Sequence, residues 1–209
     1  MLKNILFCTL LTVLIGVSVI MGYNTLNSSR YNAPPVTKIS SMCDVADGIA
    51  YRVIIQGIGV SDAVNIFMET RDLKRMGVEE IHFYINSPGG SLFDSFAIYD
   101  TIKRLNKEGI VTVAEIEGGC MSAAVLIAAA CDYRLASENT NFMVHDPRSY
   151  NTTASDSDKQ MLKDCTFRYA NLLALNSDLT SEEWMEKMKF STWFSSEEAL
   201  EWGLIDEIK

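Results

Sequence analysis

A serine among small residues is the side chain best placed to do covalent chemistry in this sequence. Ser122 stands in Gly118-Gly-Cys-Met-Ser-Ala-Ala124, ahead of an apolar run that ends at Cys131. A serine hydroxyl becomes a nucleophile when a base removes its proton and donors stabilise the oxyanion that forms. A helix beginning there would direct free N–H groups and its positive dipole end toward that charge. The alternative is an ordinary helix cap, for which serine is also favoured.

Only two histidines, His82 and His145, could serve as the base. Histidine is the usual proton acceptor near neutral pH. His82 lies in the middle of an alternating apolar segment, which indicates a structural residue. His145 ends the apolar segment 142–144 and precedes Asp146 and Pro147, and a strand end that opens into a loop is where folds present catalytic groups. If Ser122 is a nucleophile, His145 is therefore its predicted base.

A glycine turn supplies the third element of a possible hydrolase site. Asn86-Ser-Pro-Gly-Gly-Ser91 follows an apolar segment. Paired glycines after a strand allow backbone N–H groups to face a bound carbonyl without interference from a Cβ atom. The alternative is an ordinary Pro-Gly turn.

Apolar spacing predicts the strands and helices that must position these residues. Alternating or β-branched segments indicate strands, and apolar residues spaced at three and four positions indicate helices. Strands are predicted at 51–56, 80–85, 110–116, 132–136 and 141–144, and helices at 61–76, 94–105, 156–175 and 181–188. This alternation predicts an α/β fold with a parallel sheet and helices packed on it.

The N-terminal segment predicts a membrane anchor or a signal peptide over residues 1–23. Its uncharged run of about 19 residues approaches the roughly 20 that cross a bilayer. A cleaved signal peptide is the main alternative, and a buried soluble helix is the third. A polar linker is expected over 24–45, and the catalytic domain over 46–209. The protein is thus expected to be membrane-anchored with its side undetermined, or otherwise cytoplasmic or secreted.

Charge and cysteine content exclude several classes of function. The formal net charge of −9 and the absence of a basic run argue against nucleic-acid binding. No Cys-x-x-Cys occurs, and two histidines do not form a common zinc site with these cysteines, so no metal site is predicted. Cys43 and Cys165 are the only plausible disulfide pair, but buried free cysteines are favoured.

Five segments in one order resemble the ClpP family, the proteolytic subunits of ATP-dependent Clp serine proteases. The resemblance covers about residues 50–209 and implies a ClpP/crotonase-type spiral of β-β-α units with a projecting helical handle. It also implies rings, heptameric in the family, that receive peptide or unfolded protein from an AAA+ unfoldase. ATP would be used only by that partner, and no cofactor is implied. The segments are Ile85–Ser91, Ala97–Thr101, Gly118–Ala124, Met143–Pro147 and Ser195–Asp206.

The resemblance assigns roles to individual positions. Ser122 matches the family nucleophile and His145 its general base. Gly90 and Ala123 match the oxyanion-hole donors, and the neighbouring Gly89 and Ser91 are expected to contact the substrate. All six of these residues lie within the segments that carry the resemblance.

The third member of the triad does not match. The family's aspartate position falls on Ser191, which can fix a histidine tautomer but contributes no charge. Asp146, Glu183 or Glu186 could replace the missing acid. The family's glycine-rich segment after the histidine is also replaced, by 148–153, and its N-terminal axial loop is not recognisable.

Three functions remain open on the sequence. The first is a ClpP-like serine endopeptidase that acts through an acyl-enzyme on Ser122. The second is a catalytically weak or inactive relative with a structural or regulatory role, which Ser191 favours. The third is an exported, ATP-independent protease similar to signal-peptide peptidases, although their serine–lysine chemistry would not need His145. An acyl-CoA enzyme of the crotonase type is a more distant alternative.

Overall fold

The strands and helices predicted between residues 51 and 188 are all present in the computed structural model, which describes residues 37–149 and 155–209. The predicted membrane span at 1–23 and the predicted linker up to residue 36 lie outside these residues. Among the helices of the described ranges, none has both the length and the apolar character needed to cross a membrane.

In the described part of the chain, one nine-stranded sheet carries the fold. Seven strands lie in the order β1-β2-β3-β4-β5-β6-β9, while β7 pairs with β5 and β8 pairs with β7. β3 to β6 are parallel because helices connect them. The bounds are β1 Thr37–Ser40, β2 Cys43–Ala46, β3 Ile49–Ile54, β4 Glu80–Ser87, β5 Val111–Met121, β6 Tyr133–Ala136, β7 Asn141–Val144, β8 Thr192–Phe194 and β9 Glu207–Ile208.

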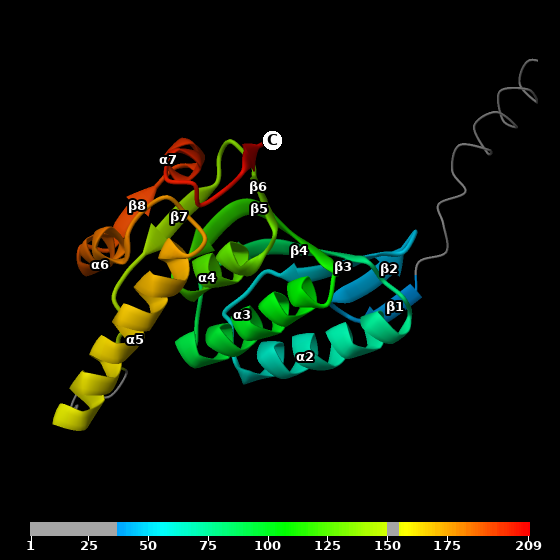
Figure 1. Ribbon diagram of the computed structural model, residues 1–209, viewed down its shortest axis with the longest axis horizontal. Coiled ribbons are helices and arrows are strands. Elements are labelled where there is room, and N and C mark those ends of the chain that lie inside the picture. The colour runs from blue at the N-terminus through cyan, green and yellow to red at the C-terminus, as the bar shows by residue number, and fades with distance from the viewer. Residues whose placement is uncertain (1–36, 150–154) are drawn as a thin grey trace, which may run out of the picture. The chain divides into compact units, whose positions relative to one another are not determined.

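Helices cover the sheet and extend beyond it (Figure 1). α2 packs beside α3, and α4 packs against both α3 and β5. All eight residues of α4 are buried, because this helix is apolar on every side. α5 extends away from the sheet, in agreement with the expected handle. The bounds are α2 Val60–Arg75, α3 Leu92–Lys107, α4 Ala123–Ala130, α5 Asp156–Ala174, α6 Ser181–Lys189 and α7 Ser196–Glu201.

The fold begins earlier than the expected linker allowed. Residues 37–46 form the antiparallel strands β1 and β2, and β2 pairs with β3. A buried ion pair anchors this hairpin: Arg52 Nε of β3 lies 2.7 Å from Glu69 Oε2 of α2. The Ser40 hydroxyl donates to the other oxygen of Glu69 at 2.6 Å. Local polarity suggested a linker, whereas these strands are stabilised by contacts with distant residues.

β5 changes its partner along its length, and this change places the site. Val113–Ile116 pair with β6, whereas Gly119–Met121 pair with β7. The change falls at Gly118, whose φ of 77° is readily adopted only by glycine. The C-terminal end of β5 therefore lies beside the end of β7, where His145 follows.

An aromatic cluster packs β7 and β8 against α6. The rings of Phe142 and Phe194 stack with centroids 5.3 Å apart, and Trp184 and Trp202 pack edge to face at 5.9 Å. Trp184 is fully buried, and its indole N–H donates to the Ser177 hydroxyl at 2.9 Å. This packing holds the β7–β8 pair, and with it the backbone on both sides of the site, in one register.

Candidate active site

Ser122 occupies a strained turn between β5 and α4. Its φ of 53° and ψ of −127° are unfavourable for a residue with a side chain, costing about 1–3 kcal/mol. Ser122 stands at the N-cap position of α4, but its hydroxyl makes no capping hydrogen bond to the helix. A sharp strand–turn–helix connection with a strained serine exposes the hydroxyl at the top of a sheet.

Main-chain and tyrosine hydrogen bonds hold this strained turn. The Ser122 N–H donates to Met143 O of β7 at 2.6 Å. The Tyr169 hydroxyl of α5 donates to Ser122 O at 2.6 Å. Burial raises the pKa of Tyr169 well above its ordinary value, so this hydroxyl remains a donor. The sequence did not predict this role of Tyr169, because the spacing of apolar residues shows only that Tyr169 lies on the apolar side of a helix.

The glycine turn packs directly against Ser122. A Cβ atom on Gly89 would lie 2.6 Å from Met121 O and 2.8 Å from the Ser122 Cβ. A Cβ on Gly90 would lie 2.2 Å from Ile58 O, because Ser91 N–H donates to that oxygen in a bridge between the two segments. Both positions also have positive φ angles, 89° and 154°. Only glycine therefore allows this approach.

Two backbone N–H groups near Ser122 remain available. In the described ranges, neither the Gly90 N–H nor the Ala123 N–H donates a hydrogen bond to the protein. Ala123 begins α4, and the first N–H groups of a helix have no partner within it. Ser91 instead caps α3, accepting from Asp94 N at 3.3 Å.

His145 is held by the main chain. Its Nδ1 lies 2.7 Å from Asp146 O. A carbonyl oxygen can only accept, so Nδ1 carries the proton and Nε2 keeps its lone pair in the neutral ring. This is the tautomer that a general base at Nε2 needs. Ser122 and His145 line the same cavity without a hydrogen bond between their side chains, and such bonds are often long before substrate binds.

Ser191 adjoins the same end of the β7–β8 pair as His145. The antiparallel register ends with Val144 and Thr192, and His145 and Ser191 are the next residues of the two segments, Ser191 with a φ of 52°. The Ser191 hydroxyl accepts a hydrogen bond from Arg148 Nη2 at 3.2 Å. The residue for which the resemblance implied an acid is thus a serine whose hydroxyl lies beside a guanidinium.

None of the three candidate replacement acids bonds to the histidine ring in the ranges that the structure covers. Glu183 caps the N-terminus of α6, and Glu186 lies 3.7 Å from Lys189 Nζ. Asp146 reaches His145 through its carbonyl oxygen and not through its carboxylate. The tautomer is therefore fixed without a negative charge.

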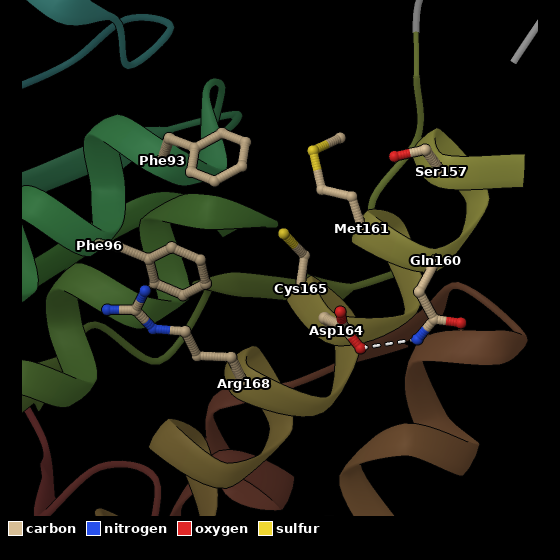
Figure 2. A pocket seen from close by; sticks show the side chains of 8 residues that line it. All are labelled: Phe93, Phe96, Ser157, Gln160, Met161, Asp164, Cys165 and Arg168. Atoms are coloured by element: carbon tan, nitrogen blue, oxygen red, sulfur yellow. Dashed lines mark hydrogen bonds between the residues drawn. The ribbon is translucent and has the colours of Figure 1, made fainter. Parts of the chain in front are cut away.

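The site opens into a cavity of about 680 Å³ that is lined by residues of the turn, the two catalytic candidates and α5. A second cavity of about 400 Å³ lies between α3 and α5 and shares Phe93, Met161 and Cys165 with the first. In Figure 2, Phe93 and Met161 face each other with the Cys165 thiol between them, and the guanidinium of Arg168 lies 4.2 Å from the Phe96 ring centroid. The two cavities together have room for an apolar side chain of a substrate beside Ser122.

Of the other titratable candidates, Cys165 lines this cavity, whereas His82, Cys43, Cys120 and Cys131 do not. His82 is held between Glu80 and Glu115 on β4 and β5, which confirms a structural role. The four cysteines in the described ranges are buried and free, so the predicted preference over a disulfide is confirmed for them. Burial raises the pKa of the Cys43 and Cys131 thiols to about 12, which makes them poor nucleophiles.

A serine on a strained strand–helix turn, with a tautomer-fixed histidine on the neighbouring strand, defines a serine hydrolase of the α/β class. Comparison with known proteins narrows this class. The sequence model of the Clp protease family matches residues 45–209. The chain therefore belongs to the Clp protease family, whose members are serine endopeptidases that need no metal or organic cofactor.

Individual relatives agree with this assignment. ATP-dependent Clp protease proteolytic subunit 2 of Tropheryma whipplei is 35% identical over 63% of this chain and 74% of its own. Proteolytic subunit 3 of Streptomyces avermitilis is 33% identical over 75% of this chain and 74% of its own. A mutant of ClpP1 from Listeria monocytogenes matches with a TM-score of 0.69 over 76% of this chain and 90% of its own, and at 22% identity it supports the fold alone.

Proposed function

We propose that this chain cleaves peptide bonds through an acyl-enzyme formed on Ser122. His145 Nε2 takes the hydroxyl proton as Oγ attacks the scissile carbonyl, and returns that proton to the leaving amine. Water then attacks the acyl-enzyme with the same histidine as base. The Nδ1–H to Asp146 O bond keeps the ring in the required tautomer throughout.

The N–H groups of Gly90 and Ala123 would stabilise the tetrahedral oxyanion. Both lack protein acceptors among the described residues, and Ala123 adds the positive end of α4. Removal of one such donor typically lowers kcat by about 10²–10³. Gly89 and Ser91 are expected to position the substrate backbone beside the turn, because both line the same cavity.

The strained conformation of Ser122 beside a cavity that also contains His145 is the observation that carries this proposal. A fluorophosphonate probe tests it on the full-length chain. We expect labelling of the natural sequence, and none in Ser122→Ala or His145→Ala. His82→Ala is the matched control and should label normally, because His82 lies away from the cavity. Labelling that persists in Ser122→Ala would refute the proposal.

A catalytically weak subunit is the second candidate, and one observation favours it. The triad-acid position holds Ser191, and the group nearest to its hydroxyl is the cation of Arg148. A negative charge there would stabilise the imidazolium, whereas a positive one opposes it. Slow labelling and slow turnover, rather than none, would support this form of the enzyme.

We propose that the chain assembles into a heptameric ring that an AAA+ unfoldase supplies with unfolded protein. Family membership supports this proposal, since the relatives are named as subunits of an ATP-dependent protease. Native mass spectrometry of the full-length protein would show a multiple of seven chains. A monomer at all concentrations would contradict it.

We further propose that residues 1–23 anchor the protein to a membrane by a single span. The support is the uncharged apolar segment of the sequence. Retention in the membrane pellet after alkaline extraction is the expected result. A reporter fused to the C-terminus would identify the side that the catalytic domain faces.

A further inference from the structure

The cavity at Ser122 has an unusual charge for this protein. Among the described residues, its lining includes one arginine, Arg148, and no aspartate or glutamate. The whole chain, by contrast, carries a formal net charge of −9. A positive group in a lining without carboxylates, on a protein that is otherwise acidic, favours the approach of an anionic group to this cavity.

Arg148 has no carboxylate partner among residues 37–149 and 155–209. In the described ranges its side chain donates to the Ser191 hydroxyl and pairs with no carboxylate. Other arginines do pair with one, and Arg134 Nη2 lies 2.9 Å from Asp206 Oδ1. A guanidinium has five N–H donors, and a single hydroxyl uses one of them. The remaining fork matches a carboxylate in geometry and charge.

The chain around Arg148 keeps this fork near the reacting atoms. Arg148 lies three residues after His145, and Pro147 between them restricts the backbone. The bond to Ser191 ties the guanidinium to the segment that adjoins the same end of the β7–β8 pair as His145. The other side of the cavity is formed by Phe93 and α5 side chains, and is apolar.

We propose that Arg148 binds a carboxylate of the peptide substrate and gives the enzyme a preference for acidic peptides. This inference rests on the proposed peptidase function of Ser122. The carboxylate belongs either to an aspartate or glutamate side chain near the scissile bond or to the C-terminus of the peptide. An apolar side chain of the same peptide enters the region of Phe93 and Met161.

Peptide binding tests this proposal without a need for turnover. The full-length chain carrying Ser122→Ala is titrated with short fluorescein-labelled peptides of alanine and leucine, which differ only by Glu or Gln at one position. That position is moved through the peptide, and each peptide is made with a free or an amidated C-terminus. For one placement we expect about two- to fivefold tighter binding of the carboxylate form, because Arg148 is exposed and exposed ion pairs contribute up to about 1 kcal/mol.

Added substitutions identify the group responsible. Arg148→Gln should reduce the Glu-to-Gln preference to near one, and Arg148→Lys should retain part of it, because lysine keeps the charge and loses the fork. Arg71→Gln on α2 removes the same charge far along the chain and should retain the full preference. The preference should also decrease as salt is added.

Each outcome decides the inference. A preference only between free and amidated peptides assigns the carboxylate to the C-terminus, and one that follows the internal residue assigns it to a side chain. Equal binding of every pair, or a preference that survives Arg148→Gln, would overturn the proposal. Failure of the peptidase function is read separately, from fluorophosphonate labelling of the natural sequence.

Discussion

Substitution of Ser191 by aspartate tests how the histidine is controlled. Residue 191 adjoins the same end of the β7–β8 pair as His145, so Ser191→Asp introduces an acid at the position that the proposed alignment with the family assigns to it. Two donors would compete for the new carboxylate. Arg148 Nη2 already lies 3.2 Å from the Ser191 oxygen, whereas His145 Nδ1 is bonded to Asp146 O at 2.7 Å. To bind the imidazole ring, the aspartate must therefore replace the His145 Nδ1–Asp146 O hydrogen bond and give up its ion pair with Arg148.

The expected magnitude follows from these contacts. Loss of the neutral bond to the carbonyl costs about 1 kcal/mol, and a charge-assisted bond in its place contributes about 1.5–3 kcal/mol. The net gain of about 0.5–2 kcal/mol corresponds to roughly a two- to thirtyfold rise in kcat. With Arg148 present, the carboxylate pairs largely with the guanidinium, so Ser191→Asp alone should raise kcat less than about threefold. Ser191→Asp with Arg148→Gln should give the full rise over Arg148→Gln.

The assay measures kcat on an uncharged fluorogenic peptide. Such a peptide has no carboxylate for Arg148 to bind, so substrate binding by Arg148 does not affect the measured kcat. Ser191→Asn is the matched control, because it has the shape of aspartate without the charge and should give no rise. A thirtyfold gain from Ser191→Asp alone would refute the competition with Arg148. Equal gains with and without Arg148→Gln would do the same.

Three further substitutions test the turn, the aromatic cluster and the edge of the sheet. Gly89→Ala should abolish labelling of the nucleophile, because its Cβ would lie 2.6 Å from Met121 O. Trp184→Ala should lower the free energy of unfolding by about 3–5 kcal/mol in urea, since the indole is fully buried. The Lys209 ammonium holds the pKa of the Glu115 carboxyl below its ordinary value. This pair therefore stabilises the fold at pH values above the ordinary pKa of the carboxyl. The stabilisation is lost as pH falls through the lowered pKa. Lys209→Met should cost less than about 1 kcal/mol at pH 7, and this cost should decrease as pH falls through the lowered pKa of Glu115.

Matched control substitutions distinguish these specific effects from a non-specific loss of structure. Gly59→Ala adds the same methyl group where no atom lies within 4 Å, and should label normally. Trp193→Ala removes an indole that is 59% exposed and should cost far less than Trp184→Ala. Normal labelling of Gly89→Ala would contradict the packing argument. A pH-independent effect of Lys209→Met would contradict the assigned cause of the pKa shift.

Much of the fold could be predicted because its periodic segments are long. Apolar spacing located the helices and strands between residues 51 and 188. β1 and β2 escaped prediction, since their stability depends on β3 and on the distant Glu69 rather than on local pattern. β8 has three residues, too few for any period to be measured, and its place is set by pairing with β7.

Some residues of the candidate site could be predicted from the sequence, and others could not. Ser122 and His145 could be proposed from residue type and from the small number of histidines. The Asp146 carbonyl could not, because every residue has one and only the folded backbone shows where it points. The role of Arg148 was also missed, since the sequence does not show that the first residue of the divergent segment 148–153 hydrogen-bonds to Ser191.

The triad acid in serine hydrolases does two things that this structure separates. It fixes the histidine tautomer, and it stabilises the positive ring that forms during the reaction. The Asp146 carbonyl can do the first, because a neutral acceptor is enough to hold Nδ1–H. It contributes little to the second, and Arg148 opposes it until a carboxylate binds there. An acidic peptide that neutralises Arg148 would remove this opposition, so acidic substrates should show a higher kcat as well as tighter binding.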